Sequence, residues 1–185
     1  MHTTTPLSCT CGAVRLEVHQ DPIIASECHC TSCRTAGRRL EALPSAPRFR
    51  EEHGGTPFVL YRKDRVRFLE GQEQLRELRL TPDSPTRRVV ASCCNSPMFL
   101  EFQQGHWLSL YASLWPADSR PAMALRTMTM DVPAEVTLDD ALPNLKRQSG
   151  TFFMKLLGAW LAMGLRVPKV TVGTEPLADD ALSAG

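Results

Sequence analysis

The chain has 185 residues and a formal net charge of +1, so its length suits one domain with a full core, and its bulk charge indicates no nucleic acid partner. It contains no run of about 18 apolar residues, which excludes an ordinary membrane-spanning helix. The first residues lack the basic and apolar regions of a secretory signal, and the number of cysteines is odd. We therefore expect a cytoplasmic protein with reduced thiols rather than a disulfide framework.

Short segments of alternating apolar and polar residues, separated by glycine and proline turns, predict a mainly β fold of antiparallel strands. Residues 34–57 are rich in arginine and proline, and we expect a long functional loop there. The β core is expected to end near residue 135. The expected strands cover residues 14–19, 23–25, 58–61, 66–68, 75–80, 88–91, 98–102 and 107–112.

The C-terminal part has a different character. Residues 151–165 predict a helix that is apolar on nearly every side, with Lys155 as its only charge. It either packs on its own domain, or forms a homodimer contact or a shallow membrane-interface anchor. We expect three parts: a β domain at 1–135, a helical appendage at 136–170, and a mobile tail at 171–185.

The seven cysteines fall into three groups with none outside them, which indicates metal ligands. These groups are Cys9 with Cys11, Cys28 with Cys30 and Cys33, and Cys93 with Cys94. Zinc is the expected metal, at one or two ions per chain, because clustered thiolates without an iron–sulfur spacing favour it.

Cys28, Cys30 and Cys33 supply three thiolates from one short stretch, and three is the number of protein ligands that a catalytic zinc keeps. The fourth ligand is then His29, water, a remote cysteine or a substrate. His29 lies between two ligands, so it is expected to point away from their metal, toward a neighbouring group or a substrate. His29 is also the only candidate general base near the cysteines.

Basic residues follow the central cysteines. Arg34 comes directly after Cys33, and Arg38 with Arg39 lies one turn further on. They are expected to offset the negative charge of three thiolates on zinc and to bind an anionic substrate, although Arg38 and Arg39 equally suit a solvated surface. His53 and His106 are isolated, and we expect them on the surface or in loops.

These motifs together resemble one family. Cys9-x-Cys11-Gly12, then Cys28-His29-Cys30-x-x-Cys33-Arg34, then a late cysteine pair before Ser96-Pro97 is similar to the glutathione-dependent formaldehyde-activating enzymes and the centromere protein V group. The resemblance covers roughly residues 7–135. It implies a zinc-bearing fold of the mammalian-suppressor-of-Sec type, with two or three small antiparallel sheets.

The resemblance also implies two zinc sites. The central cysteines would hold a zinc with an open position where glutathione sulfur acts, and Cys9 with Cys11 would join a late cysteine pair in a structural site. The late motif departs from the family pattern, because aligning on Ser96-Pro97 puts Cys94 at the second cysteine and Ala91 at the first. The structural site would then use Cys94 with either Cys93 or a ligand that is not cysteine.

The sequence leaves three functions open. In the first, the chain is a carbon–sulfur lyase that acts on an adduct of glutathione, or another small thiol, with an aldehyde. In the second, it binds a thiol or a partner protein without turnover, and in the third its zinc is structural only.

Overall fold

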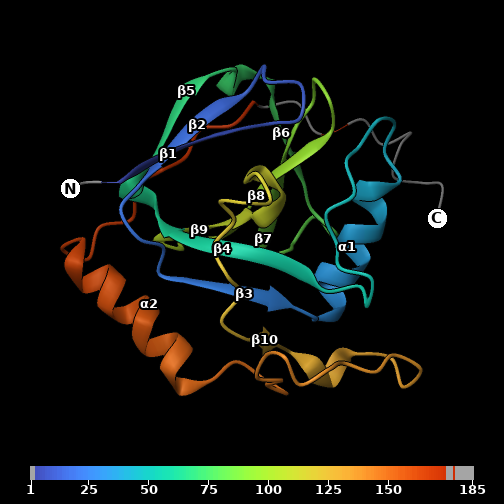
Figure 1. Ribbon diagram of the computed structural model, residues 1–185. Helices are drawn as coiled ribbons and strands as arrows, with labels where there is room; N and C mark the ends of the chain where they lie inside the picture. Colours follow the sequence, from blue (N-terminus) through green and yellow to red (C-terminus); the bar gives the residue numbers. More distant parts are fainter. Residues whose placement is uncertain (1–2, 174–176, 178–185) are drawn as a thin grey trace.

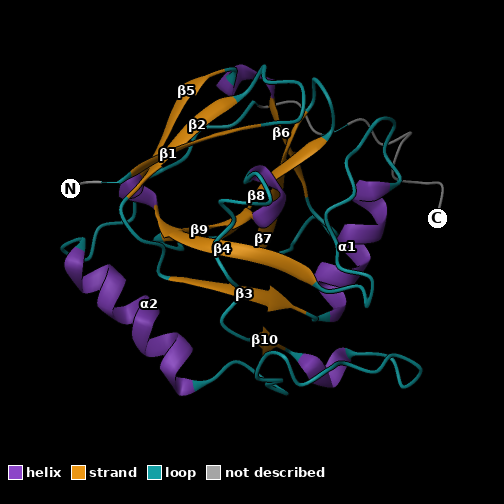
Figure 2. Cartoon of the chain, in the orientation of Figure 1, coloured by secondary structure: helices purple, strands orange, loops and turns teal. Residues whose placement is uncertain are grey.

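The computed structural model describes residues 3–173 and residue 177 of the chain. Its strands are β1 (Thr4–Ser8), β2 (Arg15–His19), β3 (Ile24–Cys28), β4 (Thr56–Arg62), β5 (Val66–Glu70), β6 (Leu75–Leu78), β7 (Thr86–Ala91), β8 (Ser96–Phe102), β9 (Trp107–Tyr111) and β10 (Arg126–Thr127). They form a three-stranded sheet, β1-β2-β5, and a seven-stranded sheet, β10-β3-β4-β9-β8-β7-β6 (Figures 1 and 2). Among the described residues only the short β10 pairs in parallel, with β3.

This architecture confirms the expected fold class, which is mainly β with small antiparallel sheets and a C-terminal helix. Each expected strand is present, with its ends shifted by a few residues. β1 and β10 were not expected. Connecting turns include short 3-10 helices at Lys63–Arg65, Gln72–Gln74, Ala112–Leu114 and Thr129–Asp131.

The seven-stranded sheet is apolar on both faces, and its strand β4 shows how. Val59 and Tyr61 point into the core shared with the three-stranded sheet. Phe58 and Leu60 point to the opposite face, where a second apolar layer forms. Successive side chains of a strand alternate between faces, so one strand can serve both layers. Residues of helices and loops, among them Leu40, Phe49 and Phe152, pack on this second layer.

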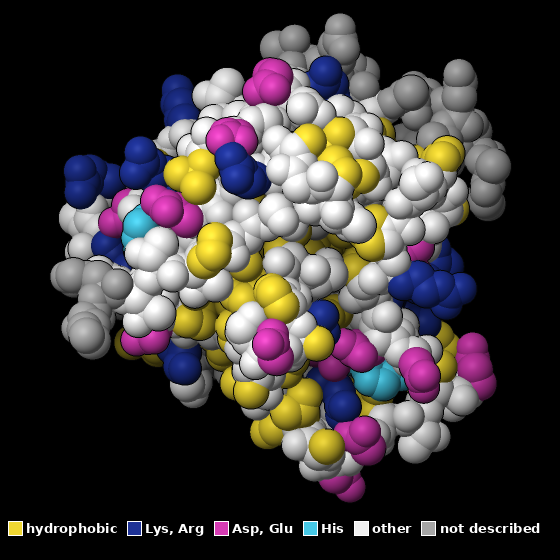
Figure 3. Space-filling view, turned by 45° about the horizontal axis from the view of Figure 1, so that its top comes forward, with side chains coloured by type: hydrophobic (Ala, Val, Ile, Leu, Met, Phe, Trp, Pro, Cys, Tyr) yellow, Lys and Arg dark blue, Asp and Glu magenta, His cyan; other side chains and the backbone are white. Residues whose placement is uncertain are grey.

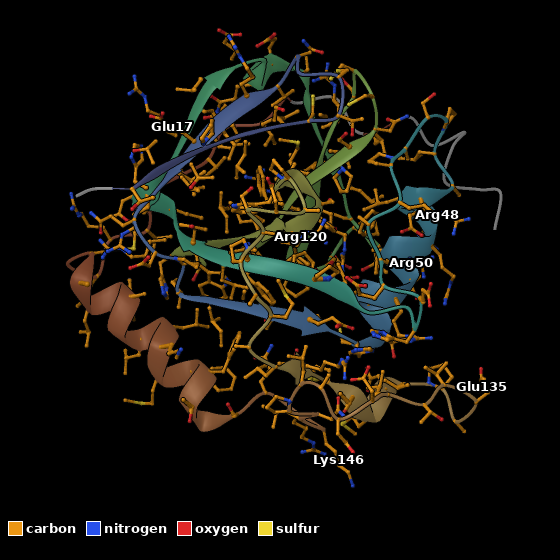
Figure 4. All side chains as sticks on the ribbon, in the orientation of Figure 1. Glu17, Arg48, Arg50, Arg120, Glu135 and Lys146 are labelled. Atoms are coloured by element: carbon orange, nitrogen blue, oxygen red, sulfur yellow. The ribbon has the colours of Figure 1, made fainter. Side chains whose placement is uncertain are left out.

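The expected loop at 34–57 is wrong in its first part, because residues Thr31–Glu41 form helix α1. The helix buries a stripe at the spacing of one helical face, Cys33, Ala36, Gly37 and Leu40. The remaining loop is held by Arg50, whose guanidinium donates to the Glu41 carboxylate at 2.7 and 2.9 Å. Figure 4 labels Arg50 beside α1.

The expected C-terminal helix is present as α2 (Gly150–Ala162), and Phe152 and Leu156 pack into the second apolar layer. His106 fastens it, because its ring Nε2 donates to the Leu156 carbonyl at 2.8 Å and its ring stacks on Trp160. His106 lies in the loop between β8 and β9, as expected, but its side chain is buried rather than at the surface. Burial lowers the pKa of His106, so its ring is neutral at neutral pH.

The other side of α2 is exposed and apolar, with Phe153, Met154 and Leu161 each more than half exposed. Hydrophobic side chains also reach the surface in the middle of the face drawn in Figure 3.

The homodimer contact through residues 151–165 stays a prediction, as do the domain limits. Most of the expected mobile tail, 171–185, lies outside the described residues. None of the described helices is long and apolar enough to span a membrane.

Candidate metal centres and the adjoining cavity

The central cysteines meet where β3 ends and α1 begins. Cys28 is the last residue of β3, Cys30 is the N-cap of α1, and Cys33 lies in its first turn. The Cys28 and Cys30 sulfurs are 3.5 Å apart, and the Cys30 sulfur accepts the Cys33 backbone N–H at 3.4 Å. All three sulfurs lie within 4.8 Å of one another, so this group could hold a metal ion. A helix N-terminus favours negative charge, and therefore favours thiolates here.

The protons of the metal-free cluster are unevenly shared. Hydrogen bonds from Cys28 and Cys33, with help from the Arg88 charge, lower the pKa of Cys30 to about 3. The hydrogen bond to Cys30 raises the pKa of Cys28 to about 12. Hydrogen bonds to both neighbours, together with burial, raise the pKa of Cys33 as well. At neutral pH the cluster therefore contains one thiolate and two thiols.

This proton distribution predicts a steep pH dependence of metal binding. A metal that binds all three sulfurs must displace the protons of Cys28 and Cys33, so its affinity rises with pH, by up to about 100-fold per pH unit for about two protons released. Competition for zinc with a chromophoric chelator, between about pH 6 and about pH 8, measures this slope after correction for the chelator's own protonation. Affinity that does not change with pH would contradict coordination by these three thiols.

The second cluster brings the first and the last cysteine pairs of the sequence together, Cys9 with Cys11 and Cys93 with Cys94. The sulfur of Cys9 lies 3.6 Å from that of Cys11 and 3.7 Å from that of Cys93, and Cys94 completes a group within 4.8 Å. Ala91 is fully buried in β7 and is not part of the group, whose fourth member is Cys93. Asn95, which follows Cys94, takes the left-handed conformation with φ of 53°, which asparagine adopts more readily than most residues other than glycine.

The donor sets of the two clusters fit different roles. Four sulfurs match a closed, structural zinc site, whereas three match a site that keeps one position open. Among the described residues, no further Cys, His, Asp or Glu joins the central group. Burial opposes ionisation of Cys94, but hydrogen bonds from Ser96 and Cys11 outweigh it and lower the pKa of Cys94 to about 6. Burial raises the pKa of Cys9 and of Cys93, so a metal must displace their protons.

Behind the central cysteines lies a group that the sequence did not reveal. The Glu27 carboxylate contacts His29 Nε2 at 2.7 Å and His53 Nδ1 at 3.2 Å, and it also pairs with Arg126 at 3.4 Å. Glu27 and His29 are buried, and this Glu27–His29–His53 group could also hold a metal ion. A Cβ on Gly55 would meet the Glu27 carboxylate at 1.8 Å, so only glycine fits there. His53 is thus not isolated, and His29 points into this group.

A cavity of about 1050 Å³ opens beside the central cysteines. Its floor is the second face of the seven-stranded sheet, where residues two apart in a strand share a face. The N-terminus of α1 forms one wall, and the segment from Met128 to Leu156 forms another. In Figure 1, β3 and β4 run between α1 on the right and α2 at the lower left. The floor residues are Ser26, Cys28, Phe58, Leu60, Trp107, Ser109, Leu100, Phe102, Thr86 and Arg88.

Arg88, not the arginines chosen from the sequence, is the cation of this cavity floor. Arg34 donates to the His53 carbonyl at 3.3 Å, and Arg38 with Arg39 is exposed in the last turn of α1, where cations suit the helix dipole. None of these three lines the cavity. Arg88 is buried and donates through Nη2 to Ser32 Oγ at 2.7 Å, while its Nη1 has no hydrogen-bond partner among the described residues.

Fold and site together define a mainly β protein with cysteine clusters that could hold metal ions. The chain belongs to the glutathione-dependent formaldehyde-activating enzyme family, which matches residues 4–125. Among solved structures, the chain is similar to a crystal structure of a Rhodobacter sphaeroides protein, at 17% identity and a TM-score of 0.44, over 61% of this chain and 89% of that one. A comparison with curated proteins gave no match.

Proposed function

We propose that the chain is a zinc-dependent carbon–sulfur lyase that makes and breaks the bond between a small thiol and an aldehyde, with glutathione as the thiol that the family name indicates. The observation that carries the proposal is the position of the central cysteines. Three sulfurs within 4.8 Å of one another form part of the wall of a large cavity, and no fourth ligand among the described residues closes the group. Structural zinc has no need of such a cavity.

Bound to Cys28, Cys30 and Cys33, zinc would supply an open position that favours the thiolate form of a substrate thiol. In the forward direction the thiol sulfur attacks the carbonyl carbon, the C=O π electrons move to oxygen, and the proton lost by the thiol ends on that oxygen. The reverse reaction breaks the C–S bond and returns thiol and aldehyde. No redox change is involved.

The chain's own contribution to this reaction is charge and orientation. Arg88 offsets the negative charge of the three thiolates, and its guanidinium, which lines the cavity, can stabilise the oxygen that becomes negative during attack. Its Nη2 is fixed on Ser32, one residue before Cys33, so the guanidinium is tied to the cysteine segment. A preorganised donor of this kind acts most strongly in a cavity that excludes water.

Turnover tests the proposal. Zinc-loaded protein is expected to accelerate exchange between free formaldehyde and its glutathione adduct, followed by exchange NMR with carbon-13-labelled formaldehyde. Arg88→Met, which keeps the unbranched stem of the side chain and removes the charge, is expected to lower the accelerated rate by at least about tenfold. Leu161→Ser, on the exposed side of α2 and outside the cavity, serves as the control and is expected to match the wild type.

A second function is distinguished by the same experiment. Exchange no faster than in buffer, with saturable binding of glutathione still present, would replace the lyase by a protein that carries a thiol without turnover.

A further inference from the structure

The cavity is larger and more apolar than the one-carbon group of a formaldehyde adduct requires. Formaldehyde adds a single carbon to the thiol, whereas the cavity has the volume of a site for a drug-sized ligand. Most of the surface that lines it is apolar, with contributions from Phe58, Leu60, Leu100, Phe102, Trp107 and Leu156. A cavity of this kind stabilises an apolar ligand by removing its surface from water.

Charged partners for glutathione are scarce in the same walls. Glutathione carries two carboxylates and an ammonium group at neutral pH, and burying such charges without partners is costly. Among the described residues that line the cavity, Arg88 and Arg147 are the cations, and none is acidic. Arg147 is exposed, so it suits a carboxylate at the mouth of the cavity rather than in its interior. The described part of the interior therefore offers no carboxylate partner for an ammonium group.

The register of the sheet explains why the floor is hollow. Ser109 on β9 lies directly across from Leu60 on β4 and from Leu100 on β8. Leu100 in turn lies across from Arg88 on β7. The small side chain of Ser109 between two leucines leaves a depression in the floor. This row of cross-strand neighbours ends at Arg88, whose Nη2 donates to Ser32, one residue before Cys33.

We infer that the carbonyl-derived part of the substrate is a bulky apolar group, aromatic or branched aliphatic, which lies over Ser109 between Leu60 and Leu100. This inference rests on the proposed function for the reaction, but the binding of an apolar group does not depend on turnover. The thiol sulfur remains at the cysteine cluster, and any charged part of the thiol stays at the mouth near Arg147.

Relative turnover of two adducts tests the inference. Zinc-loaded protein is given the glutathione adducts of formaldehyde and of phenylacetaldehyde, and kcat/KM is measured for each against its rate in buffer. The wild type is expected to prefer the phenylacetaldehyde adduct by at least about tenfold, the effect of even one well-buried methylene group. Ser109→Phe fills the depression and is expected to reduce that ratio by at least about tenfold. Leu161→Ser is expected to leave it unchanged. A wild-type ratio near unity would overturn the inference.

A binding measurement separates this inference from the lyase proposal. If neither adduct is turned over, calorimetry with 2-phenylethanethiol decides: saturable binding that Ser109→Phe abolishes supports the apolar cavity without the lyase reaction, and absence of binding overturns the inference as well. Because Ser109 is buried, its variant is first checked by circular dichroism. If it does not fold, Phe102→Ser, at a partly exposed position of the floor, replaces it and is expected to weaken binding several-fold.

Discussion

Replacing Cys30 with serine is expected to lower the zinc content by about one ion per chain while the fold is retained. Cys30 is the thiol with the lowest pKa of the central cluster and lies between Cys28 and Cys33 in the chain. Serine removes the thiolate but keeps an oxygen that can accept the Cys33 backbone N–H, the bond that caps α1. Elemental analysis by mass spectrometry after gel filtration, compared with about two ions in the wild type, measures the loss.

Cys30→Ala separates the metal from the helix cap. It is expected to lose the same metal and also about 1 kcal/mol of stability, because alanine cannot cap α1. The four-sulfur cluster of Cys9, Cys11, Cys93 and Cys94 should keep its ion in both variants, since its ligands lie elsewhere. A Cys30→Ser protein with the full wild-type zinc content would show that the central cysteines do not hold the metal.

Replacing Glu27 with alanine is expected to lower the free energy of unfolding by about 3 kcal/mol. The buried Glu27 carboxylate contacts His29, His53 and Arg126. Its removal leaves the buried Arg126 with the exposed Asp139 as its one carboxylate partner in the described part of the chain. Urea unfolding of the zinc-saturated protein gives the value. Removing one partner of a buried ion pair is costly because the other charge remains buried.

Glu27→Gln is the matched control for this prediction. It keeps the shape beside Gly55 and one hydrogen-bonding oxygen, so it should cost clearly less than alanine. If the free energy of unfolding of Glu27→Ala lies within about 0.5 kcal/mol of the wild-type value, Glu27 behaves like an ordinary surface residue. The contacts of Glu27 with His29, His53 and Arg126 would then not support the cysteine segment.

The strands could be predicted because their signals are local. Alternation of apolar and polar residues between turn residues locates β2 to β9, and each of these was expected. β10 could not be found in this way, because it has only two residues and exists through pairing with β3. β1 lies before the first cysteines, where proline and threonines obscure the alternation.

Helix α1 was missed because its start carries an unusual signal. The usual N-cap residues are Ser, Thr, Asp and Asn, but here a cysteine sulfur accepts the N–H of the first turn. The buried stripe of Cys33, Ala36, Gly37 and Leu40 was present in the sequence and could have located the helix. Small residues in that stripe and the flanking arginines made the segment look like a loop.

The cysteines of the candidate site could be found from spacing, but its other residues could not. Arg34 is adjacent to Cys33 in sequence and yet turns toward the His53 loop, whereas Arg88 reaches Ser32 from 56 positions away. The cavity floor combines alternate residues of β3, β4, β7, β8 and β9, which only the register of the sheet brings together. Glu27 gave no signal beside three cysteines, although it joins His29 to His53.

The central claim is that the three-sulfur cluster holds a metal with a position open to a thiol from the cavity, and cobalt substitution tests it most directly. Co²⁺ replaces Zn²⁺ in both clusters, and the sulfur-to-cobalt charge-transfer absorption is recorded while a thiol is added. The account predicts that this absorption grows and saturates at about one thiol per chain, and that Cys30→Ser abolishes the increase. A spectrum that no thiol alters, with both clusters loaded with cobalt, would contradict it.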